Sequence, residues 1–155
     1  MVAQYILDQT KLISGRFGIK RVSYGDVNII VDAPIVCVIP TTVDRSWSGS
    51  SLNVDNDFET SMLVYGSSIR QGADDVQKFV DELSENLADY FNVLALGPEY
   101  SNVVNNISVT GTRFDGLITQ GMNSRIEYAY KVMGDELTRM NRIIFKHMSR
   151  VGLVG

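Results

Sequence analysis

The sequence predicts an α+β domain, with a mixed or antiparallel sheet that carries one long amphipathic helix on a face. Three observations lead to this class: a helical pattern at about residues 74–92, a continuous apolar run at 35–39, and an alternating segment at 124–132. Strand-like segments both before and after one long helix are typical of α+β domains. With 155 residues, 45% of them hydrophobic, the chain is long enough for one ordinary core.

The helix at about 74–92 is predicted by apolar residues at three- and four-residue steps. They form one stripe, made of Val76, Phe79, Val80, Leu83, Leu87 and Phe91. Asp74 and Asp75 lie in the first turn, where free amide groups and the helix dipole favour negative charge. Acidic residues cover much of the remaining surface. The helix therefore has one apolar face to bury against a sheet.

Ahead of this helix, the chain begins with a short predicted helix over residues 2–14, because its apolar residues recur at roughly helical spacing. Gly15 provides a natural stop for it. We expect a strand at 18–22 and a strand or extended segment at 27–31. Both segments come before the apolar run that forms the centre of the predicted sheet.

The run at 35–39 is apolar at every position and rich in β-branched residues, which indicates an interior strand covered on both faces. Cys37 lies within it and is predicted to be a small buried hydrophobic residue. It is the only cysteine, so the chain has no internal disulfide. We expect Pro40 to end the strand, because proline cannot donate to a β ladder.

Residues 41–57 are rich in Ser, Thr, Asn, Asp and Gly and are predicted to form a long polar loop. Trp47 lies in its middle and is either a contact anchor for a partner or a cover for the edge of the core. Asp55, Asp57 and Glu59 alternate, which suggests a metal site. The segment lacks the pattern of a calcium-binding loop, so a solvated strand edge is the favoured interpretation.

Further strands are predicted on both sides of the central helix. The segment 58–65 alternates and should place one face toward the core. After the helix, we expect strands at 103–110, at 114–119 and, most clearly, at 124–132. These segments complete the predicted sheet.

The last part of the chain, 134–155, is predicted to be a C-terminal helical extension to a single domain over 1–133. Apolar residues recur at helical steps through 134–150, and the segment is locally basic. It is either a final helix on the domain or a tail that docks on a neighbouring subunit, and a peripheral role is favoured. His147 has no catalytic or metal-binding companion and is predicted to be a surface or satisfied histidine. Together with Trp47, the candidate partner contacts are Arg139, Arg142, Lys146 and Arg150.

Composition excludes several classes of function. A net charge of −4 and a pI near 4.9 argue against a protein that binds nucleic acid over its whole surface. No apolar run approaches the length of about 20 residues that spans a bilayer, so we expect no membrane contact and assembly in a cytoplasm. The sequence contains no nucleotide-binding, hydrolase or metalloprotease motif. No catalytic, cofactor-binding or metal-binding residue is predicted.

The order and character of the elements resemble the tail terminator proteins of long-tailed bacteriophages, also called tail completion or tail-to-head joining proteins. The resemblance covers roughly residues 2–132. It rests on the successive segments APIVCVIP, FETSMLVYG, DDVQKFVDELSENLADYF and RIEYAYKV. It implies a sheet with packed helices, and a homohexameric ring in the virion that caps the tail tube and joins it to the head connector. DNA would then pass through the lumen without specific binding. The loop at 41–57 and the basic extension after Gly134 depart from the family plan.

Two other interpretations stay open. The chain is either another neck or tail-tube component of a phage, or, in a different class, a small α+β enzyme or ligand-binding domain. In the second case the Trp47 loop would be a lid over Asp55, Asp57 and Glu59. Substitution of these carboxylates would then abolish an activity or metal binding.

Overall fold

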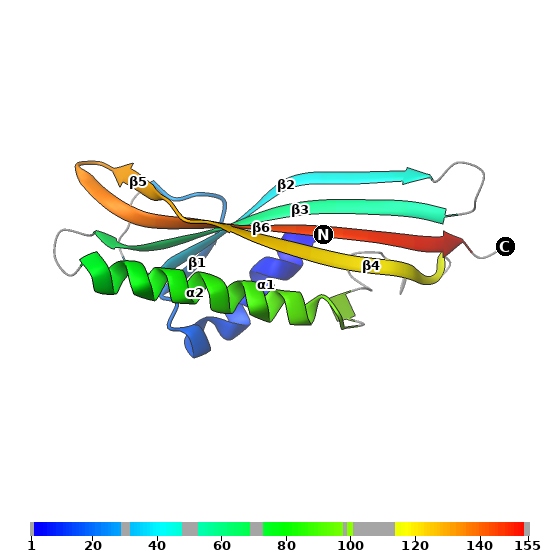
Figure 1. Cartoon of the computed structure of the whole chain (residues 1–155), viewed down its shortest axis with the longest axis horizontal. Coiled ribbons are helices and arrows are strands. Elements are labelled where there is room, and N and C mark those ends of the chain that lie inside the picture. Colours follow the sequence, from blue (N-terminus) through cyan, green and yellow to red (C-terminus); the bar gives the residue numbers. More distant parts are fainter. Residues whose placement is uncertain are drawn as a thin grey trace.

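One mixed sheet and two helices make up the described part of the protein, which confirms the α+β class (Figure 1). The computed structural model describes residues 2–28, 32–47, 53–68, 73–97, 99–100 and 114–153. The six strands are β1 (Arg21–Tyr24), β2 (Ile35–Trp47), β3 (Asn53–Ser68), β4 (Phe114–Glu127), β5 (Tyr130–Met133) and β6 (Glu136–Leu153). Their order in the sheet is β1-β2-β3-β6-β4, and β5 also pairs with β6. The β1–β2 pair is parallel and the other pairs are antiparallel.

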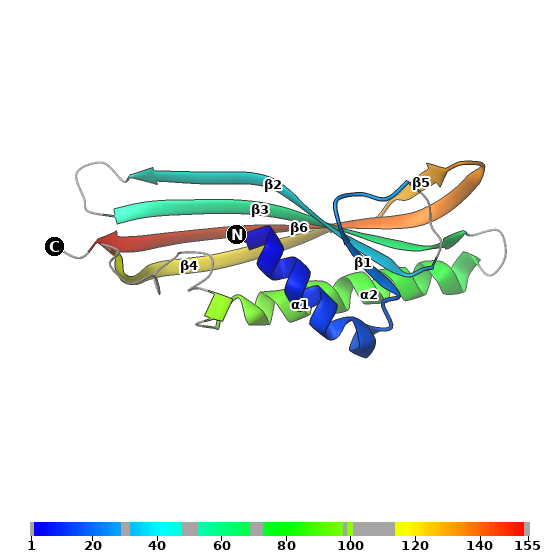
Figure 2. The same ribbon diagram turned by 180° about the vertical axis from the view of Figure 1, so that it is seen from behind.

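Both helices lie on the same face of the sheet, which we call the inner face (Figure 2). The first, α1 (Val2–Phe17), occupies the position of the predicted N-terminal helix and continues three residues past it. The second, α2 (Ala73–Leu94), occupies the position of the predicted long helix, with Asp74 and Asp75 in its first turn. The sheet extends beyond the end of α2 in both views (Figures 1 and 2).

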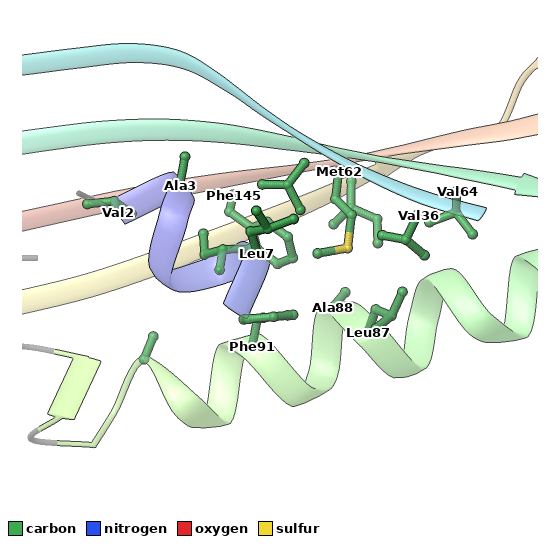
Figure 3. Close-up of a cluster of buried hydrophobic side chains, with 14 of the residues drawn as sticks. Val2, Ala3, Leu7, Val36, Met62, Val64, Leu87, Ala88, Phe91 and Phe145 are labelled. Carbon is green, nitrogen blue, oxygen red and sulfur yellow. The ribbon is translucent and has the colours of Figure 1, made fainter. Parts of the chain in front are cut away.

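The main core lies between the two helices and the inner face (Figure 3). Phe91 of α2 and Phe145 of β6 lie at its centre, with 5.5 Å between their ring centroids. Six further core residues shown in the figure are Val36, Met62 and Val64 from the sheet, Leu87 from α2, and Ala3 and Leu7 from α1. Four residues of the apolar stripe of α2 are buried here, whereas Val76 is half-buried and Phe79 is 45% exposed.

A second, smaller core lies on the opposite, outer face of the sheet. Ile35, Cys37, Leu63 and Tyr65 are its fully or almost fully buried sheet residues, and Val27 and Met133 pack against them. Cys37 is buried, as predicted. This second core covers only part of the outer face, and that difference divides the sheet into two regions.

We call these regions the proximal and distal halves of the sheet. The proximal half contains β1, β5, residues 35–38 of β2, 62–68 of β3 and 136–143 of β6. The distal half contains residues 39–47 of β2, 53–61 of β3, 144–153 of β6 and 114–125 of β4.

The helical prediction for 134–150 is wrong, because these residues belong to β6, which lies between β3 and β4 inside the sheet. The segment is not peripheral. Ile143, Ile144 and Phe145 are all buried because the sheet is covered on both faces at this point. Two-sided burial removes the apolar alternation at these three residues, and polar residues occupy the buried positions Asn141, His147 and Ser149, so the remaining apolar residues happen to fit helical steps.

The predicted loop at 41–57 is also wrong where the structure describes it. β2 continues through Pro40 to Trp47, and β3 begins at Asn53. Pro40 is tolerated because β1 pairs only with residues 35–38 of β2, and the ladder to β3 has a bulge between Pro40 and Thr42. The predicted strand at 103–110 and residues 29–31 lie outside the described residues.

The predicted strand at 124–132 is divided in the structure. β4 ends at Glu127, and β5 begins at Tyr130 and turns at Gly134, whose φ of 64° suits glycine. The predicted strand at 18–22 is present as β1, two to three residues later, and the strand at 114–119 is the beginning of β4.

Candidate interaction surface

The outer face of the distal half is a charged surface built by alternation along β3 and β6. Asn56, Phe58 and Thr60 are buried on the inner face, so Asp55, Asp57 and Glu59 lie on the outer face. Their partners across the ladder on β6 are Arg150, Met148 and Lys146, respectively. Carboxylates on one strand therefore face cations on the next at two of three positions.

Two cross-strand ion pairs join these rows. The Arg150 guanidinium donates to Asp55, with 2.7 Å between Nε and Oδ1, and the Lys146 ammonium lies 3.9 Å from Glu59 Oε2. The hydrogen bond from Arg150 lowers the pKa of the Asp55 carboxyl. These carboxylates are thus engaged with neighbouring cations. In the part of the chain that the structure describes, no group of three or more His, Cys, Asp or Glu side chains is placed to hold a metal ion.

Charge is distributed asymmetrically across this outer face. On the β2 side, Asp44 lies opposite Asp57, so two exposed carboxylates face each other without an alternating cation. On the β4 side, Arg125 lies opposite Ile144 of β6, its side chain is 70% exposed, and it forms an ion pair of 3.6 Å with Glu127 of the same strand. The outer face is therefore acidic along β2 and β3 and basic along β6, and on β4 the charges of Arg125 and Glu127 balance.

The structure divides the predicted partner contacts into two groups. Arg142, Lys146 and Arg150 lie on the outer face of β6 and are exposed, and their role as partner contacts stays a prediction. Arg139 is only 8% exposed and faces α2. Trp47 is the last residue of β2 and pairs with Val54, and its side chain lies outside the described part of the structure.

Arg139 anchors α2 to β6. Its guanidinium makes hydrogen bonds of 3.0 to 3.2 Å with both oxygens of Asp81. The Asn141 amide donates to the same carboxylate at 2.7 Å. Arg139 also lies over the rings of Tyr128 and Tyr130, at 5.6 and 4.8 Å from their centroids. Sequence reasoning missed this cluster because its two charged partners are 58 residues apart.

His147 is buried, contrary to the prediction of a surface or satisfied histidine. It is 2% exposed, and its ring lies 6.0 Å from that of Phe58 and 5.4 Å from that of Tyr100. Neither ring nitrogen has a hydrogen-bond partner among the described residues. Burial lowers the pKa of His147 to about 4, so the ring is neutral at pH 7. Its surroundings are those of a core residue.

A second polar cluster closes the outer face of the proximal half. The Tyr65 hydroxyl donates to Asp26 at 2.6 Å, and Lys131 from β5 donates to Asp26 at 2.9 Å. Burial, together with the bond to Asp26, raises the pKa of Tyr65 to about 12. Burial alone would raise the pKa of Asp26, but the bonds from Tyr65 and Lys131 lower it. This cluster ties Asp26 and β5 to the sheet on the outer face.

A groove of about 500 Å³ runs between the C-terminal turns of α1 and α2. Phe17, Tyr90 and Val93 form its apolar lining, and Arg16 and Asp89 contribute charges. It lies on the helix layer, on the opposite side of the sheet from the charged outer face.

Comparison with known proteins gives distant structural likeness and no family. No protein-family model matches the sequence, and no curated protein matches it. The chain is similar to a chain in a solved structure described as the virion of a native gene transfer agent particle. The identity is 13%, the match covers 97% of this chain and 91% of that chain, and the TM-score is 0.43. At this TM-score the likeness carries no argument about fold or function. No helix in the described residues has the length and apolar character that crossing a membrane requires.

Proposed function

We propose that the protein is a virion structural protein that forms a ring of about six copies on the tail tube of a phage-type particle. In this role it ends tail polymerisation and joins the tail to the head connector. The proposal starts from the resemblance in element order to tail terminator proteins.

The observation that carries the proposal is the form of the distal half. Four long strands continue past the end of α2, and their outer face exposes charged side chains held in cross-strand pairs (Figure 1). Pairing within a sheet holds the charges in a fixed pattern, which suits recognition of another protein surface. A rigid core with a projecting contact surface is what a ring subunit requires, since it must meet its neighbours and partners above and below.

The acidic face of α2 suits the passage of DNA through such a ring. Its exposed acidic residues are Asp74, Asp75, Glu82, Glu85 and Asp89. Negative side chains repel the phosphate backbone and give it no binding site. We therefore propose that DNA passes through the lumen without specific binding.

Two features that motivated an enzyme or ligand-binding domain are accounted for differently in the structure. Asp55 and Glu59 make ion pairs with cations of β6, and residues 41–47 form a strand in place of a lid. We propose no enzymatic activity and no cofactor. Another neck or tail-tube component is the second candidate function, since it would use the same kind of contact surface.

Two measurements test the proposal. Negative-stain images and light scattering of the purified protein should show rings of about six copies, and these rings should bind tail tubes. Removal of the gene from its phage should give particles with overlong tails. Absent tails would favour a tube component, and a monomer at all concentrations without affinity for tubes would reject the ring.

A further inference from the structure

We propose that neighbouring copies join edge to edge, with β2 of one copy pairing with β4 of the next to form one continuous sheet. This inference rests on the proposed ring, because it names the contact that would build it. The partner is a second copy of this chain, and the contact lies in the distal half.

The first edge is the free side of β2. β1 pairs with β2 only at residues 35–38, and no other described strand lies on that side of residues 39–47. Residues 41–46 are all exposed. A long exposed edge is a template for another strand. Pro40 and the bulge before Thr42 interrupt this edge at one end, and residues 42–47 continue the strand beyond them.

The second edge is the free side of β4. β4 is the last strand in the sheet order, and β6 is its one neighbour among the described strands. Asn123, Arg125 and Glu127 are exposed along it. A hydrogen bond of 3.0 Å from Asn92 to Ser124 holds the strand to α2, so this edge has a fixed position on the molecule.

Strand direction permits an identical copy to continue the sheet. β2, β3, β6 and β4 are antiparallel in succession, so the first and last of the four strands run in opposite directions. When a second copy is added beside the first in the same orientation, its β4 is antiparallel to β2. The alternation then continues without interruption, with the regular ladder of an antiparallel sheet. Such a head-to-tail contact closes into a ring when its rotation permits.

Charge selects this pairing over the symmetric one. Two β2 edges could also pair antiparallel across a twofold axis, but Asp44 and its neighbour Asp57 would then lie beside a second acidic row. Pairing β2 with β4 places this acidic side next to an edge that carries Arg125 and its ion-pair partner Glu127, which together have no net charge. Like charges oppose the twofold arrangement, and the head-to-tail arrangement avoids this repulsion.

The test is an exchange of charge between the two edges. Asp44→Lys makes the β2 edge basic, and Arg125→Glu makes the β4 edge acidic; both positions are exposed. Arg125→Glu leaves two carboxylates on the β4 edge, which should repel Asp44 of the next copy and raise the concentration needed for assembly at least about tenfold. An equimolar mixture with Asp44→Lys should assemble again, because the acidic β4 edge then meets a basic β2 edge. Native mass spectrometry should show rings that contain both variants.

Matched controls carry the same change of charge away from the edges. Glu82→Lys on α2 and Lys11→Glu on α1 alter exposed positions and should assemble as the unmodified protein does. Circular dichroism and thermal melts establish that all four variants fold.

The outcomes separate this inference from the proposed function. If the unmodified protein forms rings and the edge variants do so equally well, or if the mixture fails to restore assembly, the β2–β4 contact is rejected and the ring stands. If the unmodified protein stays a monomer at all concentrations, both the contact and the proposed ring are rejected.

Discussion

The proximal and distal halves of the sheet share strands but differ in what covers them. In the proximal half, the helices cover the inner face, and Val27 and Met133 help to cover the outer face, so Cys37 and Tyr65 are completely buried. In the distal half, the inner face is equally buried around Phe145 and His147, whereas the outer face is exposed and charged.

This difference teaches how one sheet can serve two purposes. Burial on two faces fixes the strands in the proximal half, and the same strands then carry that rigidity into the distal half. The distal half can leave one face and two edges to partners because its backbone is already positioned. We therefore expect substitutions in the proximal core to affect folding, and substitutions on the distal outer face and edges to affect assembly.

The largest expected difference comes from apolar truncations in the two regions. Leu87 of α2 is fully buried against the sheet near Val36 and Val64 (Figure 3). Leu87→Ala should lower the free energy of unfolding by about 2–5 kcal/mol, because it leaves a cavity in a packed core. Val43→Ala, at a distal position with 58% exposure, should change it by less than about 0.5 kcal/mol. Urea denaturation followed by circular dichroism measures both, and equal losses would remove the distinction between the halves.

The pH dependence of stability tests the burial of His147 on the distal inner face. The pKa of His147 is about 4 in the folded state because of burial, against 6.5 for the ordinary side chain. Between these values the unfolded chain binds a proton that the folded chain does not. Stability is therefore full above about pH 6.5 and is lost progressively as the pH falls to about 4, by about 3 kcal/mol in total.

Denaturant titrations from pH 7 to pH 4 check this prediction, with His147→Phe as the control. Phenylalanine has no titrating group and suits the neighbouring rings of Phe58 and Tyr100. The variant should lose most of the pH dependence in this window. An unchanged slope would assign the effect to other groups. Asp26, whose pKa is lowered, contributes only at the acid end of the range.

Ion pairs give a smaller version of the same comparison. Asp81→Ala should destabilise the protein by about 2–3 kcal/mol, because it leaves the Arg139 guanidinium, with 10% of its side chain exposed, without its carboxylate. Asp55→Ala removes the pair with the exposed Arg150 and should have a much smaller effect on unfolding. Thermal melts of both variants decide this. A loss for Asp55→Ala as large as that for Asp81→Ala would show that the distal pairs contribute to the fold as much as the buried one.

The sequence predicted the elements with one-sided burial and the fully apolar run at 35–39, and it failed in two other segments, where burial is two-sided or absent. The helix at 73–94 has one exposed polar face and one apolar face, so the helical period can be recognised in the sequence. Both faces of β6 are buried around Ile143 to Phe145, and neither face of β2 is buried from Thr41 to Ser46. Neither segment therefore shows the apolar alternation that identifies a strand. In both cases tertiary pairing determines the structure, and local pattern does not encode it.

The candidate surface was predictable only in part, for a related reason. The basic character of the last segment was visible, and Arg142, Lys146 and Arg150 do lie on the outer face. Arg139 shares their spacing in the sequence, yet in a strand its odd position number places it on the inner side, toward Asp81. A helical interpretation cannot make that separation, because it does not assign alternate residues to opposite faces.

The smallest expected effect tests the close approach of α2 to the proximal half. Gly66 of β3 lies where an added Cβ would meet Val80 Cγ2 at 2.6 Å and Val76 Cγ1 at 3.0 Å. Both contacts are β-branched residues on a helix, with little freedom to rotate. Gly66→Ala should therefore lower the free energy of unfolding by about 1–2 kcal/mol through overpacking.

Gly15→Ala in α1 is the matched control, because nothing lies within 4 Å of its added Cβ and its backbone is helical. It should stabilise the protein by up to about 1 kcal/mol. The midpoint temperature of thermal unfolding should therefore fall for Gly66→Ala and rise for Gly15→Ala. A Gly66→Ala variant as stable as the unmodified protein would show that α2 can move away from the sheet at little cost.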